Sequence, residues 1–172
     1  HASGSHTIAD IGTWSGALAV SLAAHLPHAH VFAVDLSADA LAVANINVQR
    51  HNLAGRIRLL HGDGCSPLPQ PVDLIVSNPP YTVLAEVDEN VRRWEPSLAL
   101  DGGIERGFAN VARLLRQMPP YLQPRGAVLV EIGAWQGAQA LALAQALFSG
   151  TRVHIHQDLA GHERVLEVTG SS

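Results

Sequence analysis

The chain has 172 residues, of which 47% are hydrophobic and 15% charged, and its formal net charge is −4. This length and composition fit one compact domain and exclude a disordered chain. The apolar runs are too short to span a bilayer, and the acidic balance gives no general attraction to nucleic acid. Its one cysteine, Cys65, and a start that does not resemble a signal peptide favour a reducing cytoplasm as the location.

The ten histidines are scattered, and neither Cys-x-x-Cys nor His-Glu-x-x-His spacing occurs, so we expect no metal site. Residues 1–6 resemble the remnant of an expression tag or a disordered start. We expect one domain over residues 7–169 and a short tail at 170–172.

From residue 7 onward, short apolar runs alternate with longer helical stretches, which is typical of a mostly parallel sheet with helices on both faces. In chain order the pattern predicts strand 7–11, helix 15–26, strand 30–35, helix 37–50, strands 56–61 and 72–76, helix 104–118, strand 126–132, helix 136–148, and strands 152–157 and 162–168. The last two strands flank a turn and are expected to form an antiparallel hairpin. The expected fold is therefore α/β, with a Rossmann-like seven-stranded sheet that ends in an antiparallel strand.

A glycine-containing loop joins the first predicted strand to the first predicted helix. Gly12 and Gly16 enclose Thr13 in this loop. Glycine permits a tight turn and close approach of the backbone to a ligand, and the helix start offers free N–H groups. Taken alone, the loop fits an ordinary strand-to-helix turn equally well.

Acidic residues end three successive predicted strands: Asp10, Asp35 and Asp63. Asp35 lies about 20 residues beyond the glycine loop, which is the spacing of a ribose ligand in doubly wound folds; its alternative role is a helix cap. Asp63 is suited to accept a hydrogen bond from an adenine amino group, and its alternative is a simple Asp-Gly turn. Because ligands of open α/β sheets bind at the carboxyl ends of the strands, the three acids together predict a nucleotide-like cofactor.

The tetrapeptide Asn78-Pro79-Pro80-Tyr81 follows the fourth predicted strand. Two prolines cannot continue a sheet ladder, so the strand must end there with a stiffly extended backbone. The Asn78 amide and the Pro79 carbonyl offer two acceptors for one amino group, and Tyr81 offers a flat face to a planar amide or base. The alternative is a proline-stopped strand with an asparagine turn. The connection over 78–103 is long, and a loop of that length is usually functional.

These motifs resemble class I S-adenosylmethionine-dependent methyltransferases that modify planar amino groups. Further segments resemble the HemK/PrmC family, which methylates the glutamine side-chain nitrogen in the Gly-Gly-Gln motif of peptide chain release factors. They are VRRWEPSLAL at 91–100, EIGAWQG at 131–137 and DLAGHERV at 158–165. The similarity extends over residues 7–168.

The resemblance implies S-adenosylmethionine as cofactor and a release factor as protein partner. It implies cofactor contacts at Asp10, Gly12, Thr13, Gly16, Asp35, Leu36, Asp63, Gly64 and Asn78. It also implies catalytic roles for Asn78, Pro79 and Tyr81, and substrate contacts at Asn78, Pro79, Pro80, Tyr81 and Glu95. Glu95 is expected to order the loop over the substrate, the alternative being a solvated surface carboxylate. No metal is needed, because transfer depends on orientation and the exclusion of water. No strong base is needed either, because the nitrogen loses its proton readily once it is alkylated.

The sequence departs from the family pattern in two ways. Trp14 stands where the family loop Asp-x-Gly-x-Gly-x-Gly has its central glycine. Its side chain would crowd the cofactor, point into solvent or pack on a neighbour that this chain lacks. The family's amino-terminal helical domain has no counterpart here, which we interpret as a shortened piece, a degraded product or a natural minimal paralogue.

Two other functions stay open at this stage. A nucleic-acid methyltransferase acting on adenine N6 or guanine N2 would hold a flipped-out base with the same Asn78-Pro79-Pro80-Tyr81 segment. The acidic charge and the lack of a Lys-rich segment favour a protein substrate over nucleic acid. The second alternative is an inactive cofactor-binding module. We expect no membrane contact, and the sequence does not define an oligomeric state.

Overall fold

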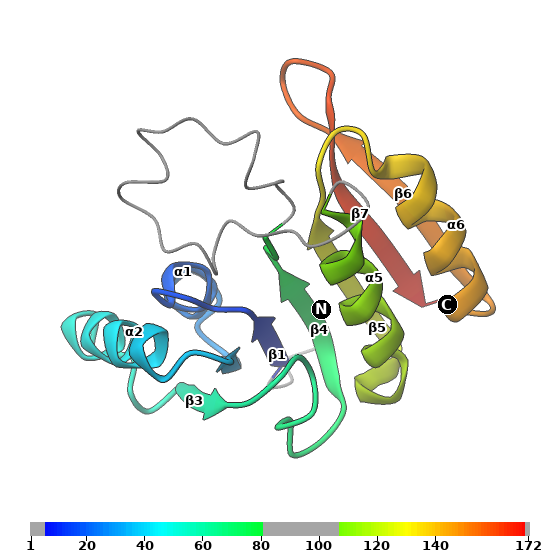
Figure 1. Cartoon of the computed structure of the whole chain (residues 1–172). Helices are drawn as coiled ribbons and strands as arrows, with labels where there is room; N and C mark the ends of the chain where they lie inside the picture. The colour runs from blue at the N-terminus through cyan, green and yellow to red at the C-terminus, as the bar shows by residue number, and fades with distance from the viewer. Residues whose placement is uncertain (1–5, 81–106, 171–172) are drawn as a thin grey trace.

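A computed structural model describes residues 6–80 and 107–170 (Figure 1). Its strands form one seven-stranded sheet in the order β3-β2-β1-β4-β5-β7-β6. They are β1 (His6–Ile11), β2 (Ala29–Asp35), β3 (Ile57–His61), β4 (Val72–Ser77), β5 (Leu122–Glu131), β6 (Thr151–Gln157) and β7 (Glu163–Gly170). The first five strands pair in parallel, and β7 runs antiparallel to both of its neighbours. The predicted fold class is confirmed.

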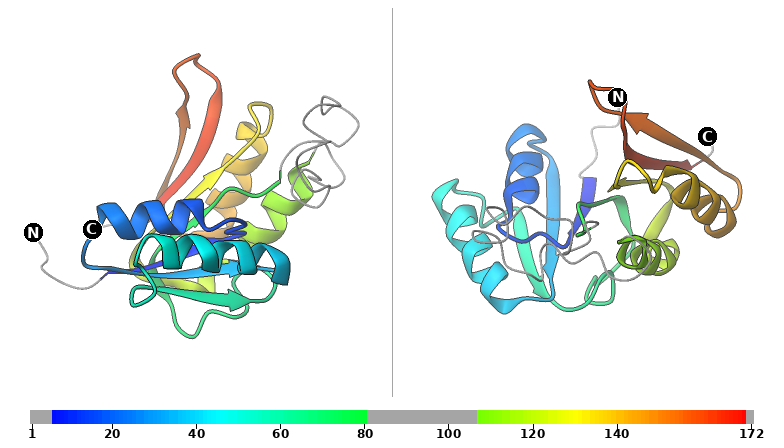
Figure 2. Two further views of the ribbon diagram at one scale, coloured as in Figure 1. Left: turned by 90° about the vertical axis from the view of Figure 1, so that its left-hand side faces the viewer. Right: turned by 45° about the horizontal axis from the view of Figure 1, so that its top comes forward.

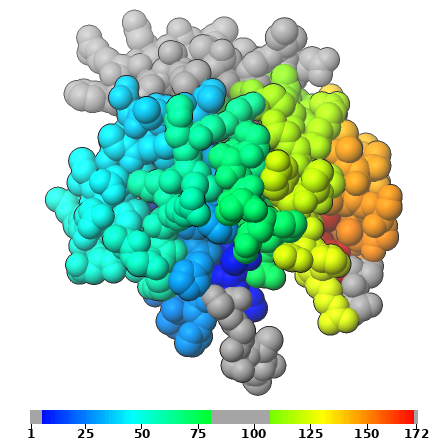
Figure 3. All heavy atoms as spheres, turned by 90° about the horizontal axis from the view of Figure 1, so that it is seen from below, coloured from blue at the N-terminus to red at the C-terminus, as the bar shows by residue number. Residues whose placement is uncertain are grey.

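Helices cover both faces of this sheet (Figure 2). They are α1 (Ala17–His25), α2 (Ala38–Arg50), α5 (Phe108–Gln117) and α6 (Gly137–Leu147), with a 3-10 turn η2 (Pro119–Tyr121) after α5. The alternation of side chains along a strand explains the two layers. Ile8 of β1 packs into a core with α1 and α2, whereas its neighbour Ala9 packs into the larger core with α5 and α6. In the space-filling view of Figure 3 the two halves of the chain pack side by side.

Several element boundaries differ from the prediction. The first helix begins at Ala17 and not at 15, because the residues before it form a turn that ends at Gly16 with φ 75°. His6 belongs to β1, where it pairs with Ala29, although it was expected to precede the domain. β7 likewise extends to Gly170, into the predicted tail.

The second half shows similar differences. α5 begins at Phe108, after Gly107 with φ 78°, and residues 104–106 of the predicted helix lie outside the described residues. β5 begins four residues earlier than predicted, since Leu122 already pairs with Val72 of β4. None of the described helices is both long and apolar enough to cross a membrane.

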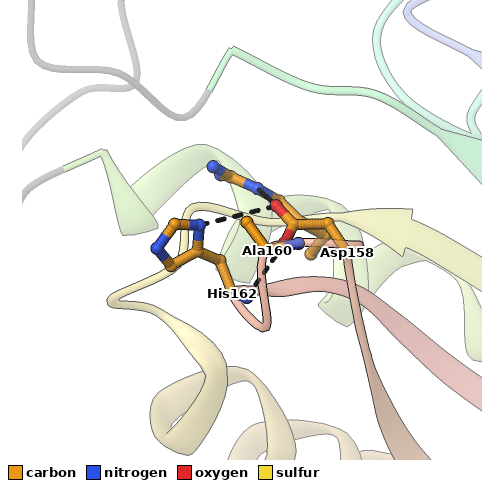
Figure 4. Close-up of polar contacts among 4 residues, drawn as sticks. Asp158, Ala160 and His162 are labelled. Carbon is orange, nitrogen blue, oxygen red and sulfur yellow. Dashed lines mark hydrogen bonds and ion pairs between the residues drawn. The ribbon is translucent and has the colours of Figure 1, made fainter.

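The predicted antiparallel hairpin is confirmed, and its turn is organised by Asp158 (Figure 4). One carboxylate oxygen accepts the backbone N–H groups of Ala160 and His162, each at 2.9 Å. The other accepts the Arg164 Nε–H at 3.1 Å. The hydrogen bond from the His162 backbone, together with the other donors, lowers the pKa of Asp158. The turn is therefore fixed by one carboxylate and its donors.

Candidate functional site

A cavity of about 540 Å³ lies at the carboxyl ends of β1, β2, β3 and β4. This volume is in the usual range for a small-molecule or cofactor site. The predicted site residues that lie in its wall are Gly12, Asp35, Leu36, Asp63, Gly64, Asn78, Pro79 and Pro80. The lining also includes Ile11, Trp14, Ser15, Val34, Ser37, Asp39, Ala40, Val43, Gly62, Asn110, Arg113 and Leu114. The fold thus gathers residues from four strand ends and from α2 and α5.

Asp35 at the end of β2 connects the glycine loop to the start of α2. Its Oδ2 accepts the backbone N–H of Trp14, and its Oδ1 accepts that of Ser37, both at 2.8 Å. The cap of α2 is Ser37 itself, whose hydroxyl accepts the N–H of Ala40. A carboxylate has about four acceptor positions, so each oxygen of Asp35 can still accept a ligand hydroxyl.

Asp63 lies in the loop after β3 and forms an ion pair with Arg113 of α5. The Arg113 Nη1 lies 2.5 Å from the Asp63 Oδ1, and both side chains are about half exposed. No other described residue forms a hydrogen bond with the Asp63 carboxylate. Oδ2 therefore remains available to a donor in the cavity.

Gly12 has the left-handed backbone and the open surroundings that the predicted close approach of a ligand would require. Its φ is +74°, and no atom lies within 4 Å of the position that a Cβ would occupy. The N–H groups of Gly12 and Thr13 both donate to the Val34 carbonyl at 2.9 Å, which holds the loop against β2. A ligand can therefore lie directly against the backbone at this position.

Three of the predicted cofactor residues, Asp10, Thr13 and Gly16, do not line the cavity and instead support the loop beneath it. Asp10 is 1% exposed, and its Oδ2 accepts the Thr13 hydroxyl at 2.5 Å and the Ala19 N–H at 3.1 Å. A Cβ on Gly16 would lie 3.1 Å from that of Ala44, so glycine lets α1 and α2 approach closely.

Burial gives Asp10 a testable effect on stability. It raises the pKa of this carboxyl from 3.8 to about 6, although the hydrogen bonds from Thr13 and Ala19 oppose the shift. Since the folded pKa is the higher one, Asp10 contributes stability at acidic pH that is lost as pH rises from about 4 to about 6. A shift of this size corresponds to about 3 kcal/mol.

In the native chain, the free energy of unfolding should therefore fall by about 3 kcal/mol across this pH interval. We expect this fall to be absent in Asp10→Asn. Urea unfolding at a series of pH values measures the difference from the native chain. Asp39→Asn, at an exposed position in the first turn of α2, is the matched control. An Asp10→Asn profile parallel to that of the native chain would contradict the role assigned to the buried carboxyl.

Trp14 lies in the cavity wall and does not fill the cavity. Its backbone is left-handed, with φ 49°, and the residue is 48% exposed. A left-handed conformation costs a residue with a Cβ about 1–2 kcal/mol and costs glycine almost nothing. The Trp14 N–H that holds Asp35 is a backbone group, so glycine would retain this hydrogen bond.

We expect Trp14→Gly to change the dissociation constant of S-adenosylhomocysteine by less than about threefold, equivalent to under 1 kcal/mol. The reason is that the cavity is already open with Trp14 in place and that the bond to Asp35 is kept. Isothermal titration of both proteins measures the change. A gain in affinity of about tenfold or more would show instead that the indole crowds the ligand.

The segment after β4 ends the strand, as its two prolines predicted. Ser77 is the last residue of the strand, and its hydroxyl donates to the Ile11 carbonyl at 2.7 Å. Asn78 is exposed, whereas Pro79 is buried, so the asparagine lies at the rim of the cavity on a fixed backbone. Tyr81 and Glu95 lie outside the described residues, and their roles remain predictions.

The contribution of α5 to the cavity was not predicted from the sequence. Asn110 and Arg113 line the cavity, and the Asn110 amide lies 3.5 Å from the Pro80 carbonyl, the long limit of a hydrogen bond. No local motif marks these residues, because their partners lie 30 and 50 positions earlier in the chain. Among residues 6–80 and 107–170, no group of three or more His, Cys, Asp or Glu side chains is placed to hold a metal ion.

The model of one protein family, the methyltransferase small domain, matches residues 1–94. The chain belongs to this family. The match covers the glycine loop, the three acids and the Asn78-Pro79 segment. The family and the fold imply S-adenosylmethionine as the methyl donor.

The relatives of this methyltransferase domain confirm the resemblance to HemK/PrmC. The chain is 44% identical over 163 residues to the release factor glutamine methyltransferase of Thermosynechococcus vestitus, with 91% of this chain and 56% of that protein covered. It is 41% identical to the protein of the same name from Cereibacter sphaeroides, with 93% and 58% covered. The chain thus spans somewhat more than half the length of these relatives.

Solved structures share the fold at lower sequence identity. A methyltransferase from Pyrococcus furiosus superposes with a TM-score of 0.73 at 19% identity, over 98% of this chain and 77% of that one. A ribosomal protein L11 methylase from Lactobacillus delbrueckii gives a TM-score of 0.68 at 21% identity, over 99% and 73%. These similarities establish the architecture of the sheet and its helices.

Proposed function

We propose that this chain is the catalytic part of an enzyme that methylates the side-chain amide nitrogen of glutamine in the Gly-Gly-Gln motif of a peptide chain release factor. One observation carries the proposal: Asp35, Asp63 and Asn78-Pro79 line the same cavity. Hydrogen-bond acceptors for the nucleoside of a cofactor and for the planar amide of a substrate therefore lie in one cavity. The names of the relatives support glutamine as the amide.

The cavity fits S-adenosylmethionine in size and in chemistry. Asp35 would accept the ribose hydroxyls, Asp63 the adenine amino group, and Gly12 would lie under the methionine part, where the space above its Cα is open. Leu36 and Val43, both exposed apolar side chains of the wall, offer contact to the base. When bound, the cofactor supplies an activated methyl group.

The chain's own residues orient the acceptor. The Asn78 side-chain oxygen and the Pro79 carbonyl would accept the two N–H bonds of the glutamine amide, which turns the nitrogen lone pair toward the methyl group. Buried Pro79 and the bond from Ser77 to Ile11 hold this segment still. From the family resemblance, we propose that Tyr81 lies flat against the amide and that Glu95 orders the loop over it.

Methyl transfer to a purified release factor tests the proposal. The chain is incubated with S-adenosylmethionine carrying a labelled methyl group and with a release factor that has either Gly-Gly-Gln or Gly-Gly-Ala at the motif. We expect label on the glutamine of the first protein and none on the second. Label on RNA or DNA offered in parallel, with none on the release factor, would favour the adenine or guanine alternative and overturn the proposal.

Because the proposed substrate takes part in translation, the proposal also implies a cytoplasmic location. The interaction with the release factor would be that of an enzyme with its substrate.

A further inference from the structure

Two side chains of α5, one helical turn apart, hold the loop that carries Asp63. Arg113 forms the ion pair with the Asp63 carboxylate at 2.5 Å. Gln117 accepts the backbone N–H of Cys65 at 3.0 Å. Residues four apart lie on the same helix face, so both contacts come from one surface of α5.

The loop backbone is fixed on its other side as well. The Gly62 N–H donates to the Asp35 carbonyl at 3.0 Å, which ties the loop to β2. Gly64 has φ +56°, and a Cβ there would lie 1.9 Å from the Gln117 amide oxygen, so the backbone passes directly beneath Gln117. The position of the loop is thus set by β2 and by α5 together.

The Asp63 side chain itself depends on Arg113. It is 50% exposed, so packing does not fix its rotamer, and Arg113 is the one described partner of its carboxylate. Arg113 occupies Oδ1 and leaves Oδ2 for the cavity that both residues line. The ion pair therefore determines where the free carboxylate oxygen lies.

We propose that Arg113 is a positioning residue that aims Asp63 at the exocyclic group of the cofactor's base, with Gln117 holding the loop in place. A carboxylate only accepts hydrogen bonds. A fixed Asp63 therefore binds a 6-amino purine, whose amino group donates, in preference to a 6-oxo purine, whose carbonyl oxygen is a second acceptor. Without Arg113 the carboxylate turns to solvent and the selection is lost. This inference rests on the proposed binding of S-adenosylmethionine.

Calorimetric titration with S-adenosylhomocysteine and with its 6-oxo analogue S-inosylhomocysteine tests the role of Arg113. We expect the native chain to prefer the adenosyl compound by about tenfold or more, and Arg113→Ala to reduce this preference to less than about threefold. Arg113→Lys, which keeps the charge, should restore part of the preference. Arg116→Ala is the control, since Arg116 is an exposed arginine of α5 outside the cavity wall.

The thiol of Cys65 gives an independent readout of the loop. Cys65 is fully buried, and burial raises its pKa to about 12, so a disulfide reagent reacts only when the loop opens. We expect Gln117→Ala to raise the reaction rate about tenfold, because it removes the bond to the Cys65 N–H, and Arg116→Ala to leave the rate unchanged. Equal rates for Gln117→Ala and the native chain would overturn the role of Gln117.

The outcomes separate the two proposals. If the native chain prefers S-adenosylhomocysteine and Arg113→Ala keeps that preference in full, Arg113 has no positioning role while the proposed function stands. If the folded native chain binds neither compound, the proposed function fails, and the inference fails with it.

Discussion

Asn78→Ala is expected to lower the rate constant of methyl transfer by about a thousandfold or more, while the dissociation constant of S-adenosylmethionine stays within about threefold. Asn78 lies exposed at the rim of the cavity, where its side-chain oxygen would accept an N–H of the substrate amide. Its loss therefore falls on the orientation of the acceptor nitrogen and not on the cofactor. Single-turnover transfer to the release factor measures the first quantity, and calorimetric titration measures the second.

The matched control for this variant is Asn45→Ala, at an exposed asparagine of α2 that does not line the cavity. We expect it to retain both transfer and cofactor binding. A loss of cofactor affinity in Asn78→Ala as large as the loss of transfer would contradict the division of roles between Asn78 and the two acids.

The second large effect is expected at Asp35. Asp35→Ala should weaken the binding of S-adenosylmethionine about a hundredfold, because hydrogen bonds to a charged group contribute about 1.5–3 kcal/mol and two ribose hydroxyls would lose their acceptor. The backbone N–H groups of Trp14 and Ser37 lose the same partner. Titration of the folded variant, with its unfolding curve measured alongside, gives the affinity and the stability separately.

Asp39→Asn is again a suitable control, since Asp39 lies in the wall of the same cavity and is exposed. We expect it to bind S-adenosylmethionine within about threefold of the native chain. If Asp35→Ala binds S-adenosylmethionine as tightly as this control, other residues bind the ribose. Asp35 then only accepts the backbone N–H groups of the glycine loop and of the start of α2.

The strands could be predicted from the sequence because each is a short apolar run that ends in a polar residue or a turn. The run that ends at Asp35 and the run before Asn78 are examples, and both strands have their carboxyl ends at the cavity. The hairpin could be predicted from the turn between its strands. Helix starts were harder to predict. α1 and α5 each begin after a glycine with a left-handed backbone, Gly16 and Gly107, and neither start has a side-chain cap that would mark it in the sequence.

The depth of each site residue could not be predicted from the sequence. Asp10, Asp35 and Asp63 show the same local pattern, an acid at a strand end, but Asp10 lies beneath the loop whereas the other two line the cavity. The start of α1 lies against Asp10, since the Ala19 N–H donates to its carboxylate, and this contact explains the burial of Asp10. Arg113 lies 50 positions from its partner, so only the packing of α5 reveals it.

Isothermal titration of the folded chain with S-adenosylmethionine and with S-adenosylhomocysteine tests the central claim most directly. The cavity of about 540 Å³, with Gly12, Asp35 and Asp63 in its wall, predicts one bound molecule per chain for each compound. The absence of binding by a folded sample would contradict the claim that these residues form a cofactor site.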